Sequence, residues 1–169
     1  MAERVTVEEI AAYRTAVLEG CDGVGKSTLA HVLVTGHGFT SVHSPRTPDH
    51  QDLINRYRDL LARPGRLVLD RSFLSELVYG PLYRGHSRIT WSQALDLAEL
   101  VTNRDGVFLH LTAPTATVHD RLKNRDGQAP ALEEIAALAE AYERTFRTLG
   151  AHTPVLTYDT VSNAARTSG

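Results

Sequence analysis

The sequence contains only one cysteine, Cys21, among its 169 residues. One cysteine cannot form a disulfide within the chain, which excludes a disulfide-stapled secreted scaffold and fits a reducing compartment. No apolar run approaches the ~18–20 residues that a membrane-spanning helix needs. Residues 1–9 carry three glutamates where a targeting sequence would place basic and then apolar residues. We therefore expect a soluble, cytoplasmic protein with no membrane partner.

The chain also lacks an excess of positive charge. Its 18 lysines and arginines against 20 aspartates and glutamates give a formal charge of −2, so no global field is available for non-specific nucleic-acid binding. The eight histidines form no H-E-x-x-H pattern, and we expect no zinc site. The length predicts one domain over residues 1–169, with an amphipathic lead-in at 1–13 and a polar tail at 160–169.

Short apolar runs rich in β-forming residues alternate with longer segments of helical periodicity. This alternation predicts an α/β domain with a mostly parallel sheet. The clearest helix has its apolar stripe between residues 135 and 149. The expected strands are 15–19, 39–43, 66–70, 107–112 and 154–158.

The first expected strand runs directly into the glycine-rich segment GCDGVGKST, residues 20–28. This segment satisfies the pattern G-x-x-x-x-G-K-[ST] between a strand and a helix, the context in which the pattern indicates a phosphate-binding loop. In such a loop the backbone N–H groups surround a phosphate, the lysine reaches the β- and γ-phosphates, and the serine hydroxyl ligates Mg²⁺. The residues expected to bind ATP are Gly20, Gly23, Gly25, Lys26, Ser27 and Thr28.

The third expected strand ends in a carboxylate, Asp70. Many strands end in aspartate as a turn or cap residue, so this position alone is a weak signal. Together with the phosphate loop it predicts a Mg²⁺ site made by Ser27 and Asp70, either directly or through water.

Two arginines, Arg121 and Arg125, lie one helical turn apart and share a helix face. We expect them to form a lid over residues 121–130 that neutralises charge during phosphoryl transfer. The alternative is a solvated face on which they pair with Asp120 or Asp126. The sequence has no N-K-x-D motif for reading guanine and is short for a helicase, so the lid favours a kinase for a small molecule.

Three segments together resemble a known group of proteins. LEGCDGVGKST, DRSFLSELVYGPLYRG and DRLKNR look like the phosphate loop, the D-R-x-x-x-S-x-x-x-Y segment and the arginine lid of thymidylate kinases, within the wider thymidylate and deoxynucleoside kinase group. The resemblance implies a P-loop NTPase fold, a three-layer α/β/α sandwich around a five-stranded parallel sheet. It also implies ATP and Mg²⁺ as donor and a deoxynucleoside monophosphate as acceptor, thymidylate or a related or modified pyrimidine nucleotide foremost. Members of the group often form homodimers.

The same resemblance assigns roles to individual residues. It implies that Asp22 lies near the acceptor sugar and the transferring phosphate, and that Arg71 grips the acceptor's 5′-phosphate. Ser75 and Tyr79 match the lining of the acceptor base and sugar pocket; the alternative is a packed helix in which Tyr79 is a core residue. With Lys26, the lid arginines and Arg71, Asp22 completes the expected catalytic set.

The sequence departs from the group at two places. Gly80-Pro81 follows the tyrosine where thymidylate kinases usually have glutamine, and Ser44-Pro45-Arg46 replaces the R-E-P-G segment, leaving Arg46 as a candidate phosphate contact. Deoxynucleoside kinases place a Glu-Pro there, whose glutamate is the base for a hydroxyl acceptor. Its absence disfavours a nucleoside acceptor, although Asp22 or Asp49 could serve instead. A nucleoside kinase and a P-loop switch without an acceptor remain the two alternatives.

Overall fold

The protein is built on one parallel β-sheet. The computed structural model describes residues 5–42 and 52–167, and their side chains as far as Asn163. Its five strands lie in the order β2-β3-β1-β4-β5 and pair only in parallel. The strands are β1 (Thr15–Glu19), β2 (Thr40–Val42), β3 (Leu67–Asp70), β4 (Gly106–Thr112) and β5 (Val155–Asp159). The parallel α/β fold expected from the sequence is confirmed.

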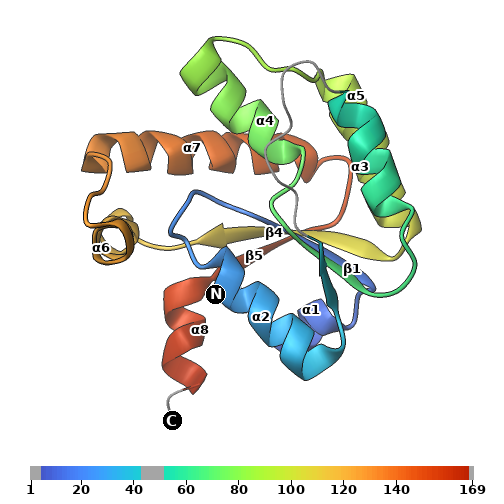
Figure 1. The fold of residues 1–169 in the computed structure, drawn as a ribbon, viewed down its shortest axis with the longest axis horizontal. Helices are drawn as coiled ribbons and strands as arrows, with labels where there is room; N and C mark the ends of the chain where they lie inside the picture. Colours follow the sequence, from blue (N-terminus) through green and yellow to red (C-terminus); the bar gives the residue numbers. More distant parts are fainter. Residues whose placement is uncertain (1–4, 43–51, 168–169) are drawn as a thin grey trace.

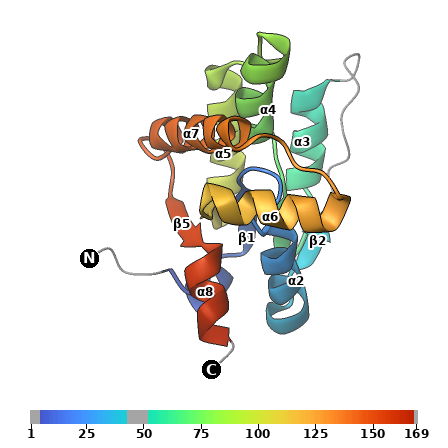
Figure 2. The same cartoon turned by 90° about the vertical axis from the view of Figure 1, so that its left-hand side faces the viewer.

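Helices cover both faces of this sheet, giving the expected three layers (Figure 1). One face carries α1 (Val7–Ala11), α2 (Lys26–His37) and α8 (Thr160–Thr167); the other carries α3 (Leu53–Leu61), α4 (Leu74–Tyr79), α5 (Trp91–Asn103) and α7 (Leu132–Leu149). A short π-helix, η1 (Gly80–Arg84), extends α4. The remaining helix, α6 (Thr115–Asp126), crosses the carboxyl ends of the strands (Figure 2).

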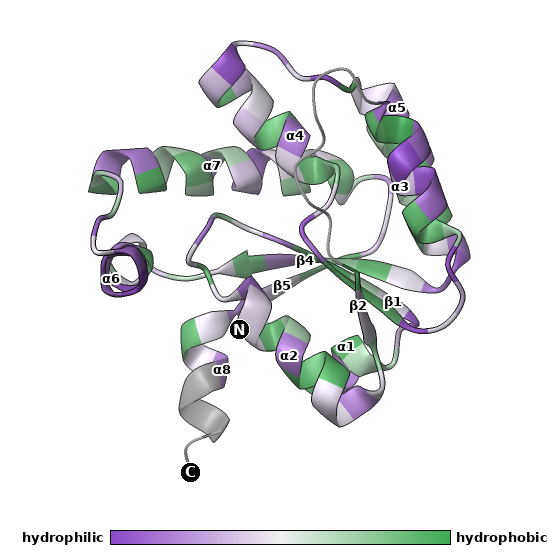
Figure 3. Ribbon diagram, in the orientation of Figure 1, coloured by the Kyte–Doolittle hydropathy of each residue, from purple (hydrophilic) through white to green (hydrophobic). Residues whose placement is uncertain are grey.

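Hydrophobic residues predominate in the central strands β1 and β4 (Figure 3). Every residue of β1 is buried, as expected for a central strand covered by helices on both faces. The stripe predicted on the last long helix is also present, since Ile135, Tyr142, Phe146 and Leu149 are all buried. Burial of these faces, rather than helix propensity, holds the layers together.

The strand order places a crevice at the carboxyl end of β1. From this central strand the chain first adds β3 and β2 on one side and then β4 and β5 on the other. Ligands of open α/β sheets bind at such a switch point, outside the carboxyl ends of the strands. The register aligns Leu18 with Asp70 and Glu19 with His110, so the ends of β1, β3 and β4 meet at this crevice.

Both ends of the chain are more structured than their composition predicts. Ile10 in α1 is fully buried and belongs to the hydrophobic core, so the described part of the lead-in packs against the rest of the domain. The expected polar tail begins with α8, and the Thr160 hydroxyl at its start donates to the carbonyl of Val24, at 2.8 Å. Within the expected lid at 121–130, α6 continues to Asp126 and ends at Gly127 with φ +77°. Across residues 5–42 and 52–167, no helix combines the length and apolarity needed to cross a membrane.

Candidate active site

The phosphate loop, Gly20–Thr28, joins the carboxyl end of β1 to the first turn of α2. Gly25 starts that helix with φ +114°, a backbone conformation that favours glycine. A Cβ at Gly20 would lie 2.7 Å from the carbonyl oxygen of Leu111 in β4, too close for any side chain. The glycines therefore allow the loop to turn tightly against the sheet, and loops of this kind bind an anion with backbone N–H groups.

Lys26 lies inside this loop and is only 6% exposed. Its ammonium donates to the carbonyl oxygens of Gly20, at 2.7 Å, and Cys21, at 3.0 Å. Burial lowers the pKa of Lys26, and the nearby carboxylate of Glu19 opposes that shift. The side chain thus holds a desolvated positive charge at the mouth of the loop, where a phosphate would bind it strongly.

Ser27 and Asp70 come together from different elements. The Ser27 hydroxyl at the start of α2 donates to Asp70 Oδ2 at the end of β3, at 3.0 Å. Two adjacent protein oxygens suit Mg²⁺, which keeps several waters and takes further ligands from substrate phosphates. Within the part of the chain that the structure describes, no three His, Cys, Asp or Glu side chains gather as a metal cage. The residues present therefore fit a nucleotide-bound Mg²⁺, with most of its ligands coming from water and phosphate.

The lid helix α6 contacts the phosphate loop through both expected arginines. Arg125 donates to the two carboxylate oxygens of Asp22, at 3.3 and 3.0 Å, and this hydrogen bonding is the main cause of the lowered pKa of Asp22. Arg125 also pairs with Asp126, the partner that the alternative interpretation named. Arg121 donates to the carbonyl of Val24, at 2.9 Å, and to the Thr160 hydroxyl, at 3.2 Å. The structure places both arginines at the loop, and their part in phosphoryl transfer stays a prediction.

Arg71 adopts an unusual backbone conformation with φ +92°. A non-glycine residue in this region is strained by about 1–3 kcal/mol, and such strain is concentrated at functional sites. Its guanidinium approaches Asp22, with an N–O distance of 3.9 Å, and lies over the Tyr79 ring, 5.9 Å from the centroid. Arg71 therefore lies between the phosphate loop and α4, with its charge only partly neutralised.

The structure places Tyr79 beside this arginine but gives Ser75 a different neighbour. Tyr79 stacks on Tyr83 with ring centroids 5.8 Å apart, and burial raises the pKa of Tyr79 to about 12. The Ser75 hydroxyl points inward and donates to Glu19, with an O–O distance of 2.9 Å to Oε2. Arg46 and Asp49 lie outside the described residues. The acceptor-binding roles of Ser75, Tyr79 and Arg46 remain predictions.

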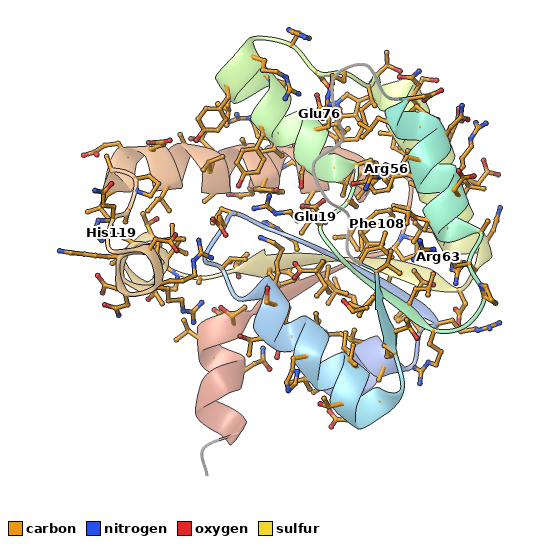
Figure 4. All side chains as sticks on the ribbon, in the orientation of Figure 1. Glu19, Arg56, Arg63, Glu76, Phe108 and His119 are labelled. Atoms are coloured by element: carbon orange, nitrogen blue, oxygen red, sulfur yellow. The ribbon has the colours of Figure 1, made fainter. Side chains whose placement is uncertain are left out.

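Glu19, the last residue of β1, is a site residue that sequence reasoning missed. Glu19 is fully buried, and Figure 4 shows the labelled side chain in the region between the sheet and helices α4 and α7. It accepts hydrogen bonds from the Ser72 backbone N–H, the Ser72 and Ser75 hydroxyls and the Tyr142 hydroxyl, at 2.7–3.1 Å. Burial raises the pKa of Glu19, while Lys26 and the serine hydrogen bonds oppose the shift. The sequence did contain one signal for Glu19: it is the charged last residue of an expected buried strand, directly before the first glycine of the loop.

At least three cavities border the phosphate loop, and the lid helix lines two of them. The tyrosine cavity, about 260 Å³, lies on the α4 and α7 side and is lined by Asp22, Tyr79, Tyr83 and Leu122, among others. The Thr28 cavity, about 280 Å³, lies on the α1 and α8 side and is lined by Gly25, Thr28, Arg121, Thr160 and Asn163, among others. The lid helix contributes to both, through Leu122 to the first and Arg121 to the second. The loop and lid thus separate two spaces, each large enough for part of a small molecule.

Comparison with protein-family descriptions found no match, and comparison with curated protein sequences found none either. Solved structures do match. The YorR protein of Bacillus subtilis, in complex with phosphorylated GDP, superposes with a TM-score of 0.75 at 21% identity, over 86% of this chain and 85% of that one.

Deoxyadenosine kinase from M. mycoides also superposes. Its complex with dCTP gives a TM-score of 0.57 at 16% identity, over 86% of this chain and 89% of that one. Its complex with dATP gives 0.52 at 16% identity, over 86% and 90%. At these identities the likeness is one of fold: the chain shares the three-layer parallel α/β architecture of the YorR protein and of a deoxynucleoside kinase.

Proposed function

We propose that this protein transfers the γ-phosphoryl group of ATP to a deoxynucleoside monophosphate, with thymidylate or a related or modified pyrimidine nucleotide as the foremost acceptor. The observation that carries the proposal is that the lid helix borders two cavities, one on each side of the phosphate loop. A kinase needs two such spaces, one for the donor and one for the acceptor. A switch needs only one.

The donor binds across the phosphate loop. Its triphosphate takes the loop N–H groups and the Lys26 ammonium, which the nucleotide draws away from the carbonyls of Gly20 and Cys21. Its base occupies the Thr28 cavity, whose lining supplies hydroxyl, amide and guanidinium groups from Thr28, Asn163 and Arg121. Ser27 and Asp70 would hold Mg²⁺, which neutralises charge on the β- and γ-phosphates when it is bound.

The acceptor enters from the side of α4. Arg71 presents a planar guanidinium suited to two hydrogen bonds with the acceptor phosphate. Tyr79 packs against the deoxyribose and leaves little room for a 2′-hydroxyl. Asp22, at the phosphate loop, lies beside Arg71 with an N–O distance of 3.9 Å, and Arg46 is proposed as a second phosphate contact.

The transfer itself relies on positioning and charge, with no covalent enzyme intermediate. An ionised phosphate oxygen is already a nucleophile, so the acceptor needs no general base. Arg125 keeps the pKa of Asp22 low, which makes Asp22 a weak base. The lid arginines supply the positive charge that the transition state requires.

A nucleoside acceptor is the second candidate. It is favoured by one observation, the structural likeness to deoxyadenosine kinase from M. mycoides. In that case Asp22 or Asp49 would have to accept the proton of a 5′-hydroxyl, and the ion pair between Asp22 and Arg125 opposes this role for Asp22.

The test is an ADP-release assay with ATP and Mg²⁺ against a panel of deoxynucleosides and their 5′-monophosphates, thymidine and thymidylate included. We expect stimulation by one or more monophosphates and none by the matching nucleosides. Stimulation by nucleosides alone would instead support the second candidate, a kinase with a nucleoside acceptor. Slow ADP release that no acceptor stimulates would contradict both and favour a switch.

A further inference from the structure

Glu19 connects three elements of the site at a single buried point. It ends β1, and the next residue, Gly20, opens the phosphate loop. Its carboxylate contacts the start of the α4 segment through Ser72 and Ser75 and contacts α7 through Tyr142. A residue at this point fixes the position of the phosphate loop relative to the segment that carries Arg71.

The contact with Ser72 is the decisive one. Ser72 follows Arg71 directly, and its backbone N–H donates to Glu19 Oε1 at 2.7 Å. On the other side, the N–H of Arg71 donates to the carbonyl of Leu18, at 3.2 Å. The two peptide groups that flank the Arg71 Cα are therefore both anchored to the end of β1.

This anchoring accounts for the backbone of Arg71. A non-glycine residue stays at φ +92° only when its surroundings fix it there. If the contact with Glu19 were lost, Arg71 could relax toward an ordinary conformation, and its guanidinium would move relative to the phosphate loop. The Ser72 N–H would also be left buried without an acceptor.

The carboxylate is well suited to this task. It is inaccessible to solvent, yet each oxygen has at least two donors, so its burial leaves no unsatisfied acceptor. The charged groups around it are Lys26 and Arg71, and its other polar neighbours are hydroxyls of Ser72, Ser75 and Tyr142. A network in which every member is satisfied holds its groups rigidly.

We propose that Glu19 is a positioning residue for phosphoryl transfer: its carboxylate clamps the Ser72 backbone, holds Arg71 in its left-handed conformation and so sets the acceptor-phosphate site in register with the donor loop. This inference rests on the proposed function, because it assigns to Arg71 the acceptor phosphate. In this proposal Glu19 acts through the length and geometry of its side chain, and not through its charge.

Two substitutions separate reach from charge. Glu19→Gln keeps the side-chain length, since its carbonyl can accept from Ser72 and its amide can donate to the Ser75 and Tyr142 hydroxyls, which can turn to accept. Glu19→Asp keeps the charge but withdraws the carboxylate by one methylene from the Ser72 N–H. Glu76→Asp is the matched control, because Glu76 on α4 is also a buried carboxylate, and it accepts hydrogen bonds from Arg84 and Arg88, including the Arg88 N–H at 2.8 Å.

The readout is the KM for the acceptor against the KM for ATP, measured with the monophosphate that the panel identifies. We expect Glu19→Asp to raise the acceptor KM by about 10-fold or more, with the ATP KM within about 3-fold of the parent value, as for loss of a buried hydrogen-bond acceptor. Glu19→Gln and Glu76→Asp should leave the acceptor KM within about 3-fold. An equal rise in Glu19→Gln would overturn the proposal in favour of charge, and an equal rise in Glu76→Asp would show general loosening of α4.

A second measurement does not depend on catalysis. We expect hydrogen exchange at the Ser72 amide to be slow in the parent protein and in Glu19→Gln, and about 10-fold faster or more in Glu19→Asp. If the parent protein phosphorylates nothing in the panel, the proposed function fails, and the exchange rates still decide whether Glu19 clamps Ser72. If Glu19→Asp does not fold, fast exchange at Ser72 in the folded Glu19→Gln variant would still overturn the proposal.

Discussion

The strained backbone of Arg71 predicts an unusual ranking of two substitutions. Arg71→Gly and Arg71→Ala both remove the guanidinium, so they differ only in the backbone. A left-handed conformation costs an L-residue about 1–2 kcal/mol, which glycine avoids. Glycine loses about 0.5–1 kcal/mol more conformational free energy on folding. At φ +92° the first effect is larger, and we expect Arg71→Gly to be more stable than Arg71→Ala by about 0.7 kcal/mol.

The comparison needs a position with ordinary helical backbone. Glu140 lies within α7, its side chain is 71% exposed, and it pairs with Arg144 on the surface. There Glu140→Gly should be less stable than Glu140→Ala by about 1 kcal/mol. The sign of the glycine effect therefore reverses between the two positions, and the two differences together amount to about 1.5–2 kcal/mol.

Urea unfolding at 25 °C measures all four variants. If Arg71→Gly is less stable than Arg71→Ala by the same amount as the pair at Glu140, Arg71 does not have a left-handed backbone and the reasoning is refuted. In the kinase assay, both Arg71 variants should raise the acceptor KM more than the ATP KM. An unchanged acceptor KM would contradict the proposed contact with the acceptor phosphate.

Four further results are expected. Lys26→Ala should lose at least about 10²-fold in turnover, as when one preorganised electrostatic donor is removed, and full turnover would contradict the assignment of the loop. Asp70→Asn should raise the Mg²⁺ concentration needed for half-maximal activity, measured by titration at fixed ATP; an unchanged requirement would exclude Asp70 as a ligand. Arg125→Ala should raise the pKa of Asp22 toward its usual value, measured by carboxyl NMR, and no change would show that their contact does not persist in solution. Burial lowers the pKa of His110, so the unfolded chain binds more protons than the folded chain between that pKa and about 6.5, and the stability should fall as the pH drops from about 7 to 5. Urea unfolding of His110→Phe should show a weaker dependence of stability on pH. An equally strong dependence in that variant would mean that another group causes it.

The fold and the phosphate loop were predictable because both depend on local signals. The pattern at residues 20–28 includes its own strand and helix flanks, and β1 and α2 lie where it places them. The stripe on α7 repeats for several turns, so its buried face is visible in the sequence. The lid arginines share a face by spacing alone, and the structure places that face at the loop.

The features that were missed depend on contacts between distant segments. Glu19 is buried only because α4 and α7 cover the end of β1, and the residues next to Glu19 in the sequence do not predict that contact. Thr160 resembles part of a polar tail until α8 brings it to Val24. The left-handed backbone of Arg71 follows from anchoring at Leu18 and Glu19, more than 50 residues earlier in the chain.

Transfer of the γ-phosphate can be followed directly by ³¹P NMR, with ATP, Mg²⁺ and an excess of thymidylate or the other monophosphate that the panel selects. If the protein is a nucleotide kinase, the γ-phosphate signal is replaced by the β-phosphate of a new nucleoside diphosphate, and Lys26→Ala suppresses this change. Conversion of the γ-phosphate to inorganic phosphate alone, at a rate that no acceptor alters, would contradict the proposed function.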